Sequence, residues 1–570
     1  MRHFTQFILS AFIILFFNLQ LTAQGGRIPV PAKNGMVASS HYLASEVGKD
    51  ILVQGGTAVD ASIATAFALA VSLPSAGNIG GGGFLVYQGS NGESTSFNFR
   101  EKAPLAATRD MYLDEDGNIK DNSNHEGLLS VGVPGTVAGL YKAHQKYGKL
   151  SWSKLVQPAI DIAEKGFPVS PPLAGFSNWV FENKDEYKST AAIFLKNGQT
   201  PLENGDILIQ KDLAETLKRI RDKGADGFYK GKTASLVADF MKAHGGIITK
   251  KDLNKYEAEE MQTITGNYRG YEIIGMRPPS SGGVAIIEML NILEAYDLEE
   301  MGHNSAESLH FITEAMRRAF ADRAQFLGDL NFNEYVPIEE LTSKEYAGKL
   351  REGIENEKAS KSDSANFNKA HLLYESPQTT HISVVDKEGN AVSLTYTLEQ
   401  SYGSKIVVEG AGFLLNNEMG DFNAIPGYTD TKGRIGTRPN QIEPEKRMLS
   451  SMSPTIVAKD GKPVIVIGSP GGRTIINTVL QVIINMIDYK MDIAKAIESS
   501  RIHHQWLPDV SYFEEWGFSP DTQRIYKEMG HEIETRNSQG RAMGIFIDPV
   551  TGMLEGAADS RSYDGKAVGY

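Results

Sequence analysis

The sequence predicts a layered domain of the α+β class, with central antiparallel sheets covered by helices. Three observations lead to this prediction. Helical spacing of apolar residues recurs between residues 40 and 323, a strongly specified β-hairpin spans residues 379–397, and short strands and helices follow it. The 570-residue chain is 41% hydrophobic and 22% charged, as expected of a folded globular protein. Helices and strands segregated in this way build layered domains.

The first 23 residues indicate a secretory signal peptide. Arg2 and His3 precede the apolar residues 7–17, and Leu21-Thr22-Ala23 offers a cleavage site. A membrane anchor is the alternative, but this apolar stretch is too short to span ~30 Å of hydrocarbon comfortably. We therefore expect an exported protein, periplasmic or secreted, without a membrane span once the signal is removed.

Helices are predicted before residue 326. Residues 40–72 suggest two packed helices broken at Gly55-Gly56, and further helical patterns cover residues 151–165, 210–222 and 284–296. Asn304 and Glu307 form a plausible capping box for the next helix. On that helix one face carries Leu309, Ile312, Met316, Ala319 and Arg323, and packing against the core is a sufficient explanation of it.

The segment from residue 379 onward is predicted to be rich in strands. After the hairpin we expect strands at 405–415, 454–458, 463–468 and 544–548, with helices at 474–488 and 491–499. No internal repeat is visible.

The hairpin has a fixed register. Residues 386–390, Asp-Lys-Glu-Gly-Asn, predict a type I turn followed by a left-handed glycine. If Asp386 pairs with Asn390, Thr379 faces Thr397. One face then collects Ile382, Val384, Val392, Leu394 and Tyr396, and the other is a strip of hydroxyl and imidazole groups: Thr379, His381, Ser383, Ser393, Thr395 and Thr397.

The segment before the hairpin suggests self-cleavage. Residues 351–378 are charged, rich in Ser and Asn, and too poor in apolar residues to order strongly. Cleavage between Gln378 and Thr379 would give Thr379 a free α-amine beside its own hydroxyl, so that one residue supplies base and nucleophile.

Composition excludes several classes of function. A formal net charge of −13 argues against nucleic acid or anionic membrane as a partner. The absence of cysteine rules out disulfides, thiolate metal sites and a Cys nucleophile. The glycine run at 80–83 precedes a strand rather than a helix, so we expect close backbone packing there and no nucleotide. His503-His504 alone suggests a metal, and we predict neither metal nor cofactor.

Several ordered motifs carry a family resemblance. They are the hairpin with GAGFLLNNEMGDF after it, GGTAVDASIA (55–64), NIGGGGFLVY (78–87), FREKAP (99–104), VGVPGTVAGL (131–140), PPSSGG (278–283), RMLSSMSPT (447–455) and GSPGG (468–472). With them the chain after residue 28 resembles the γ-glutamyltranspeptidase family of N-terminal-nucleophile hydrolases. The resemblance implies a four-layer αββα sandwich, self-cleaved into a large subunit (24–378) and a small subunit (379–570) that stay associated.

The resemblance also implies the chemistry. Thr379 would attack the γ-carbonyl of glutathione or another γ-glutamyl compound, and Thr397 would orient it, as the hairpin register independently suggests. Gly471 and Gly472, between a strand and a helix, would form the oxyanion hole. Water, or the amine of an amino acid or dipeptide, would then accept the acyl group.

The implied substrate site pairs both charges of the glutamyl group. Arg100, Ser450 and Ser451 match positions that bind its α-carboxylate, which a guanidinium can grip with two parallel bonds. Glu399, Glu418 and Asp421 match positions that bind its ammonium. Glu399 departs from the Asn that many members carry.

Two alternatives remain at this point. One is a related acylase acting on glutaryl or cephalosporin-type amides, whose substrates lack the α-amine. The other is an inactive homologue used as a binding protein, against which intact Thr379, Thr397 and Gly471-Gly472 weigh.

Overall fold

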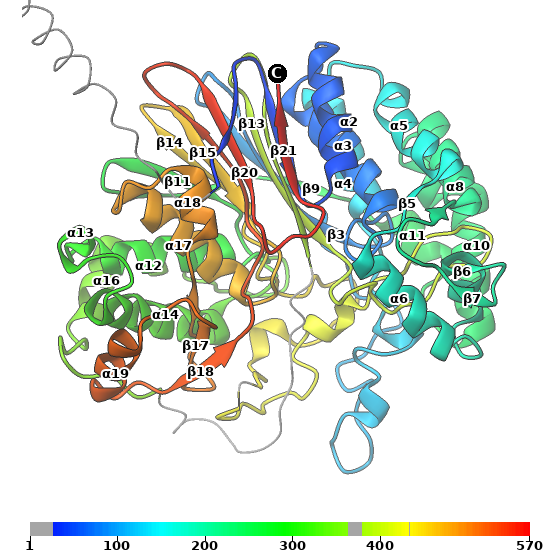
Figure 1. Cartoon of the computed structure of the whole chain (residues 1–570). Helices are drawn as coiled ribbons and strands as arrows, with labels where there is room; N and C mark the ends of the chain where they lie inside the picture. The colour runs from blue at the N-terminus through cyan, green and yellow to red at the C-terminus, as the bar shows by residue number, and fades with distance from the viewer. Residues whose placement is uncertain (1–26, 363–378, 433) are drawn as a thin grey trace, which may run out of the picture.

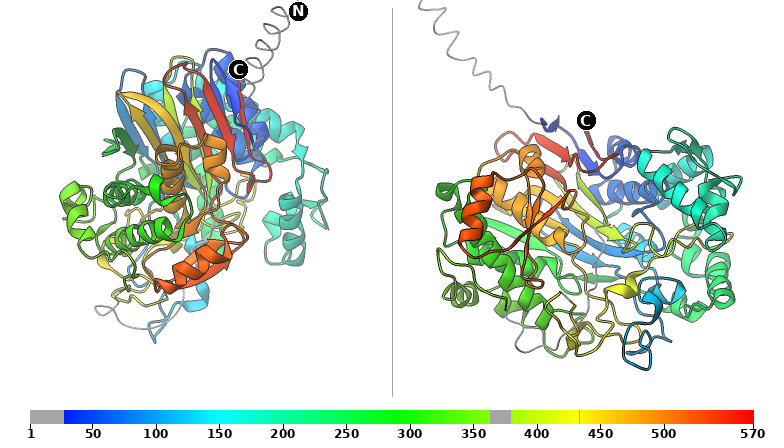
Figure 2. Two further views of the ribbon diagram at one scale, coloured as in Figure 1. Left: turned by 60° about the vertical axis from the view of Figure 1, so that its left-hand side comes forward. Right: turned by 60° about the horizontal axis from the view of Figure 1, so that its bottom comes forward.

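The computed structural model describes residues 27–362, 379–432 and 434–570. Two seven-stranded sheets lie face to face in its centre, and a layer of helices covers the outer face of each (Figures 1 and 2). This is the predicted αββα sandwich of the α+β class. The expected signal peptide, at residues 1–23, lies outside the described residues.

The first sheet carries the hairpin in its middle. Its order is β21-β2-β12-β13-β3-β4-β9, and every neighbouring pair is antiparallel. Its strands are β2 (Met36–Ser39), β3 (Gly82–Gln88), β4 (Ser94–Asn98), β9 (Glu259–Met261), β12 (Thr380–Val385), β13 (Ala391–Thr397) and β21 (Lys566–Gly569).

The second sheet has the order β1-β20-β19-β15-β14-β11-β10 and is also antiparallel. Its strands are β1 (Val30–Ala32), β10 (Ile264–Tyr268), β11 (Tyr271–Gly275), β14 (Thr455–Lys459), β15 (Lys462–Gly468), β19 (Met543–Ile547) and β20 (Leu554–Ala558). The peripheral strands are β5 (Phe167–Pro168), β6 (Leu195–Lys196), β7 (Thr200–Pro201), β8 (Ile207–Leu208), β16 (Ile502–His503), β17 (Ser511–Glu514) and β18 (Ile533–Arg536).

Each helical layer shares a hydrophobic core with its sheet. Against the first sheet lie α2 (Tyr42–Val53), α3 (Ala58–Ser72), α4 (Thr136–Tyr147), α5 (Trp152–Lys165), α6 (Pro171–Glu182), α7 (Lys188–Phe194), α8 (Lys211–Lys223), α9 (Asp226–Tyr229), α10 (Gly231–His244) and α11 (Lys250–Lys255). Against the second lie α12 (Gly282–Leu293), α13 (Leu298–Met301), α14 (Ala306–Phe326), α15 (Ile338–Leu341), α16 (Lys344–Arg351), α17 (Thr474–Ile487), α18 (Ile493–Glu498) and α19 (Pro520–Glu528).

The hairpin register is confirmed. Thr380 pairs with Tyr396 and Val385 with Ala391, and Gly389 has φ 84°. The apolar face of the hairpin packs against the α2–α3 side, as predicted. The opposite face is buried too, because it meets the second sheet: the Ser383 hydroxyl donates to Met543 O (3.0 Å) and the Ser393 hydroxyl to Ile467 O (3.0 Å).

Two local predictions are wrong. Residues 405–415 form no strand, only an isolated bridge between Val407 and Leu414, because Gly410 (φ 71°) and Gly412 (φ 77°) turn the chain there. Helix α14 is capped by Ser305 rather than by Asn304, and the Ser305 hydroxyl accepts from the Ser308 N–H (3.0 Å).

Both sheets combine strands from before residue 363 with strands from after residue 378. In the first sheet β12 lies between β2 and β13, and in the second β1 pairs with β20 while β11 pairs with β14. A cut before Thr379 would therefore leave two segments that share both sheets. Among the described residues, no helix combines the length and apolar character needed to cross a membrane.

Candidate functional site

Thr379 and Thr397 lie side by side at the end of the hairpin. Their hydroxyl oxygens are 3.5 Å apart, and both side chains are buried. The Thr397 hydroxyl also accepts the N–H of Glu399 (2.9 Å). The register thus brings together the two threonines that sequence reasoning paired. Gln378, the other side of the predicted cut, lies outside the described residues.

The glycine run before β3 supports Thr397. A side chain at Gly81 would start 2.0 Å from the carbonyl oxygen of Thr397, so only glycine fits. The amide of Asn78 donates to the same carbonyl (2.9 Å) and accepts the N–H of Gly81 (2.9 Å). Close backbone packing, as the sequence predicted, explains these glycines.

A small pocket opens beside the two threonines. Its cavity volume is about 30 Å³. The lining residues are Arg100, Thr379, Thr397, Glu399, Glu418, Asp421, Ser450, Ser451, Met452, Gly472 and Ile475.

Almost all the predicted site residues thus share one pocket, and Gly471 adjoins its lining residue Gly472. A larger cavity of about 640 Å³, which runs along α7 and residues 406–410, is lined by none of them.

Arg100 lies on the pocket floor and is completely buried. Its guanidinium pairs with Glu418 and Asp421, and lies 3.5 Å from Glu101. Burial opposes its charge, but these carboxylates together raise the pKa of Arg100 above the ordinary value for arginine. Arg100, predicted to bind a substrate carboxylate, therefore pairs with two of the residues predicted to bind a substrate ammonium.

Burial changes the pKa values of the acidic residues around Arg100. Burial raises the pKa of Glu418 well above its ordinary value, although Arg100 opposes the rise. It also raises the pKa of Glu101 to about 8.

Glu399 has an unusual backbone. Its φ is 77°, the left-handed region where Asn is favoured over Glu. Its carboxylate lies 3.5 Å from Nδ1 of His125, a buried residue that sequence reasoning missed. His125 lies in the loop before the VGVPGTVAGL motif but belongs to none of the motifs, so no sequence signal marked it.

The two adjacent serines of the RMLSSMSPT motif, Ser450 and Ser451, are held by residues from elsewhere in the chain. Ser450 O accepts both the N–H (2.8 Å) and the hydroxyl (2.7 Å) of Ser281. The Ser451 hydroxyl accepts a hydrogen bond from Arg323 (2.9 Å). Arg323, predicted only to share a packing face, therefore reaches the pocket wall.

Gly471 and Gly472 occupy the predicted turn between β15 and α17. Their φ values are 144° and 57°, which disfavour a side chain. Gly471 O accepts the N–H (3.2 Å) and the hydroxyl (2.7 Å) of Thr474, which begins the helix. The turn brings backbone N–H groups to a helix N-terminus beside the pocket, an arrangement suited to a developing negative charge.

The two histidines considered for a metal have protein partners. His503 contacts Asn477 Nδ2 (2.6 Å) and Gln505 Oε1 (2.9 Å), and His504 lies 3.3 Å from Asp509.

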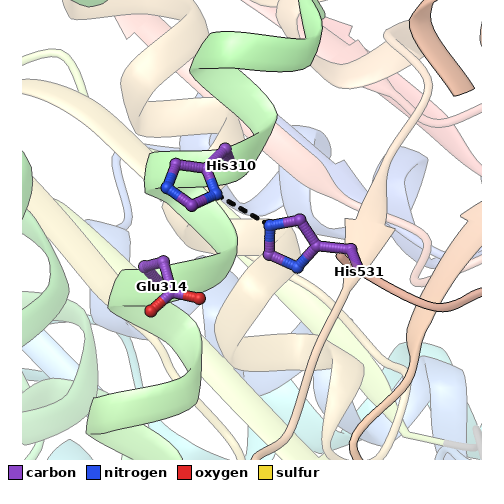
Figure 3. A group of neighbouring side chains, drawn as sticks. All are labelled: His310, Glu314 and His531. Carbon is purple, nitrogen blue, oxygen red and sulfur yellow. Dashed lines mark hydrogen bonds between the residues drawn. The ribbon is translucent and has the colours of Figure 1, made fainter. Parts of the chain in front are cut away.

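Within the described part of the chain, one set of side chains has suitable ligand atoms within 4.8 Å: His310, Glu314 and His531 (Figure 3). His310 Nδ1 and His531 Nε2 share a hydrogen bond (2.8 Å). Glu314 pairs with Arg317 and Arg318. Although burial raises it, the pKa of Glu314 falls to about 2 beside these guanidiniums. Two cations next to the only carboxylate oppose a divalent ion, so we assign a hydrogen-bonding role to this cluster.

Known proteins match this chain over most of its length. The family model described as "Gamma-glutamyltranspeptidase" matches residues 44–570. A curated relative, the glutathione hydrolase proenzyme of Escherichia coli (strain K12), is 47% identical over 95% of this chain and 93% of its own length.

Solved structures show a similarity to related proteins as well. The cephalosporin acylase of Bacillus halodurans superposes with a TM-score of 0.84 at 28% identity, over 97% of this chain and 98% of the acylase. The gamma-glutamyltranspeptidase of Helicobacter pylori gives a TM-score of 0.55 at 43% identity, over 60% of this chain and 95% of its own.

Proposed function

Because the chain belongs to the gamma-glutamyltranspeptidase family, we propose that its pocket binds a γ-glutamyl group and that Thr379 is its nucleophile. The protein is a γ-glutamyl hydrolase and transferase of the N-terminal-nucleophile class, made as a self-cleaving precursor. The observation that carries the site assignment is the contact of the Thr379 and Thr397 hydroxyls at the mouth of a pocket lined by Arg100.

In the proposed reaction the Thr379 hydroxyl attacks the γ-carbonyl. The α-amine freed by self-cleavage, with an ordinary pKa near ~8, takes the hydroxyl proton. Thr397 orients the hydroxyl, and the N–H groups of Gly471 and Gly472 stabilise the oxyanion. The leaving amine receives the proton and departs, which leaves an ester on Thr379. Water or an acceptor amine then attacks that ester and regenerates the threonine.

The proposed contacts pair each charged group of the substrate with protein side chains of opposite charge. Arg100 exchanges Glu418 and Asp421 for the α-carboxylate of the substrate, which Ser450 and Ser451 also bind. The released Asp421 and the carboxylate of Glu399 then face the substrate ammonium. The substrate carboxylate thus takes the place of Glu418 and Asp421 at Arg100, and the substrate ammonium gives the released Asp421 a new partner.

The precursor organisation is part of the proposal. We assign residues 1–23 to a signal peptide, 24–378 to a large subunit and 379–570 to a small subunit. Glutathione and related γ-glutamyl compounds are the proposed donors, amino acids or dipeptides the acceptors, and the periplasm or the medium the location.

Replacing the nucleophile tests the central assignment. Thr379→Ala should give one uncut chain with no turnover, because one hydroxyl performs both self-cleavage and catalysis. Mass spectrometry of purified protein measures the cut and the signal removal together. Thr380→Val is the matched control, since the Thr380 hydroxyl donates instead to Ser40 (3.0 Å) and its loss should leave two chains and activity. Two chains from Thr379→Ala would show that the cut is made by another route.

The similarity to a cephalosporin acylase supports one alternative, an amidase for glutaryl-type substrates. Glutaryl groups keep the carboxylate but lack the α-amine. Two acidic side chains, Glu399 and Asp421, favour a substrate that has the amine. Equal turnover of a γ-glutamyl anilide and its glutaryl analogue would favour the acylase.

A further inference from the structure

Arg323 lies near the end of α14 and is buried although it carries a permanent charge. Its guanidinium makes two hydrogen bonds to serines: Nε donates to the hydroxyl of Ser281 (2.9 Å) and Nη2 to the hydroxyl of Ser451 (2.9 Å). Packing alone does not explain this choice of residue, because a leucine or methionine would complete the apolar face without a desolvated charge.

The two hydrogen bonds reach both serines of the pocket wall. Ser451 is contacted directly. Ser450 is contacted through Ser281, whose hydroxyl and N–H both donate to Ser450 O (2.7 and 2.8 Å). One planar guanidinium therefore holds two adjacent wall residues in a fixed relation, which a flexible ammonium could not reproduce.

We propose that Arg323 is a positioning residue for the α-carboxylate of the donor, a role that rests on the proposed function of the pocket. A guanidinium only donates hydrogen bonds. It therefore makes Ser451 Oγ an acceptor and leaves the hydroxyl hydrogen of Ser451 to point at the substrate carboxylate. It also sets a second positive charge behind the subsite whose floor is Arg100.

Variants of Arg323 test this role in the processed enzyme. Arg323→Met should raise KM for a γ-glutamyl anilide on the order of 10-fold, the size expected for a hydrogen bond to a charged group, while kcat changes less than about threefold. Arg323→Lys keeps the charge but not the paired contact, so its KM should lie between that of the wild type and that of Arg323→Met. If Arg323→Met does not cleave itself into two chains, the KM of Arg323→Lys tests the inference instead.

A matched control comes from the same helix. Arg318 is also largely buried on α14, but it binds Glu314 and the carbonyl of Gly353 rather than the pocket wall. Arg318→Met should lower the thermal midpoint and leave KM unchanged. An equal rise in KM for both variants would mean that α14 acts only through stability, and would overturn the inference.

Ser451→Ala separates this inference from the proposed function. If Arg323 acts through Ser451, the two substitutions combined should raise KM by less than the product of their separate effects. A normal KM in Ser451→Ala would reject the carboxylate subsite itself. A raised KM in Ser451→Ala with a normal KM in Arg323→Met would reject Arg323 alone and leave the proposed function standing.

Discussion

The buried guanidinium of Arg100 pairs with Glu418 and Asp421 and lies 3.5 Å from Glu101. An unpaired buried ion costs several kcal/mol. Under the proposed function, substrate binding therefore exchanges the partners of Arg100 and cannot simply remove them. A γ-glutamyl donor, which brings one positive and one negative group, meets this requirement.

Arg100→Lys tests this exchange. Lysine keeps the charge but cannot make two parallel bonds to one carboxylate, so KM for a γ-glutamyl anilide should rise about 10-fold or more. Steady-state kinetics on processed enzyme gives the answer, with Arg109→Lys as the control, because Arg109 is exposed and pairs only with its neighbour Asp110. An unchanged KM would remove Arg100 from the site.

Glu399→Gln should weaken recognition of the ammonium. The substitution keeps shape and removes the charge, so KM for a γ-glutamyl anilide should rise about 3- to 10-fold. KM for the glutaryl anilide, which has no amine, should not rise. Glu409→Gln, at an exposed position, is the control. Similar changes with both substrates would mean that the Glu399 carboxylate does not act through the ammonium, because the backbone N–H that donates to Thr397 is kept in this variant.

At the scale of elements, the contact between the two sheets holds the nucleophile in place. His381 follows the nucleophile by two residues and shares its face of the hairpin. Its ring bonds to Thr395 (2.8 Å) and Ser383 (3.0 Å), and lies against Gly468 at the end of β15. A Cβ at Gly468 would start 2.3 Å from that ring. The sheets can approach this closely only because residue 468 is glycine.

Gly468→Ala should therefore destabilise the fold by about 2 kcal/mol or more and slow self-cleavage. Denaturant unfolding and the time course of chain cutting measure both effects. Gly175→Ala is the control, since this exposed helical glycine has open space around it and alanine should be neutral or slightly stabilising there. Equal stability of the two variants would mean that the sheets separate easily.

The sequence predicted correctly those structural features that are determined by residues close together in the chain. The hairpin register follows from five turn residues, and the two helices at 42–53 and 58–72 follow from spacing and a glycine break, so these predictions were confirmed. The strand at 405–415 was wrong because its apolar residues satisfy a long-range core while Gly410 and Gly412 turn the backbone.

The same limit applies to the residues of the candidate site. Arg100, Ser450 and Glu418 stood in recognisable motifs, and they do line one pocket. Arg323 and His125 touch that pocket's residues from α14 and from a distant loop, and their positions depend on tertiary packing. Position on a helix face predicted that Arg323 is buried, but not what its guanidinium would meet.

For the molecule as a whole, burial of neutral histidines on both sides of the proposed cut links stability to pH. Burial lowers the pKa of His41 to about 4 and the pKa values of His381, His503 and His531 to about 3. In the unfolded chain each titrates near about 6.5. As pH falls below 6.5 the unfolded state therefore binds more protons, and each histidine removes up to about 1.4 kcal/mol of stability per pH unit.

Buried carboxylates act in the opposite direction. Burial raises the pKa values of Glu101, Glu288 and Glu418, so the folded state holds extra protons between about pH 4.5 and their raised values. Burial also lowers the pKa values of His303, His310 and His504, so the histidines oppose the effect of these carboxylates. The histidine contribution to the free energy of unfolding should therefore decrease from pH 6.5 to pH 5.

Denaturant midpoints of the processed enzyme at pH 7.5, 6.5 and 5.5 measure this decrease, and His531→Gln identifies its source. Glutamine does not titrate, so the variant should lose less stability than the wild type on acidification, by up to about 1.4 kcal/mol per pH unit. Its deficit at pH 7.5 reports the lost hydrogen bond to His310 together with the lost stacking on Tyr526. Parallel pH profiles for the two proteins would show that His531 has the same pKa in the folded and unfolded states, and would contradict the claim that burial keeps it neutral.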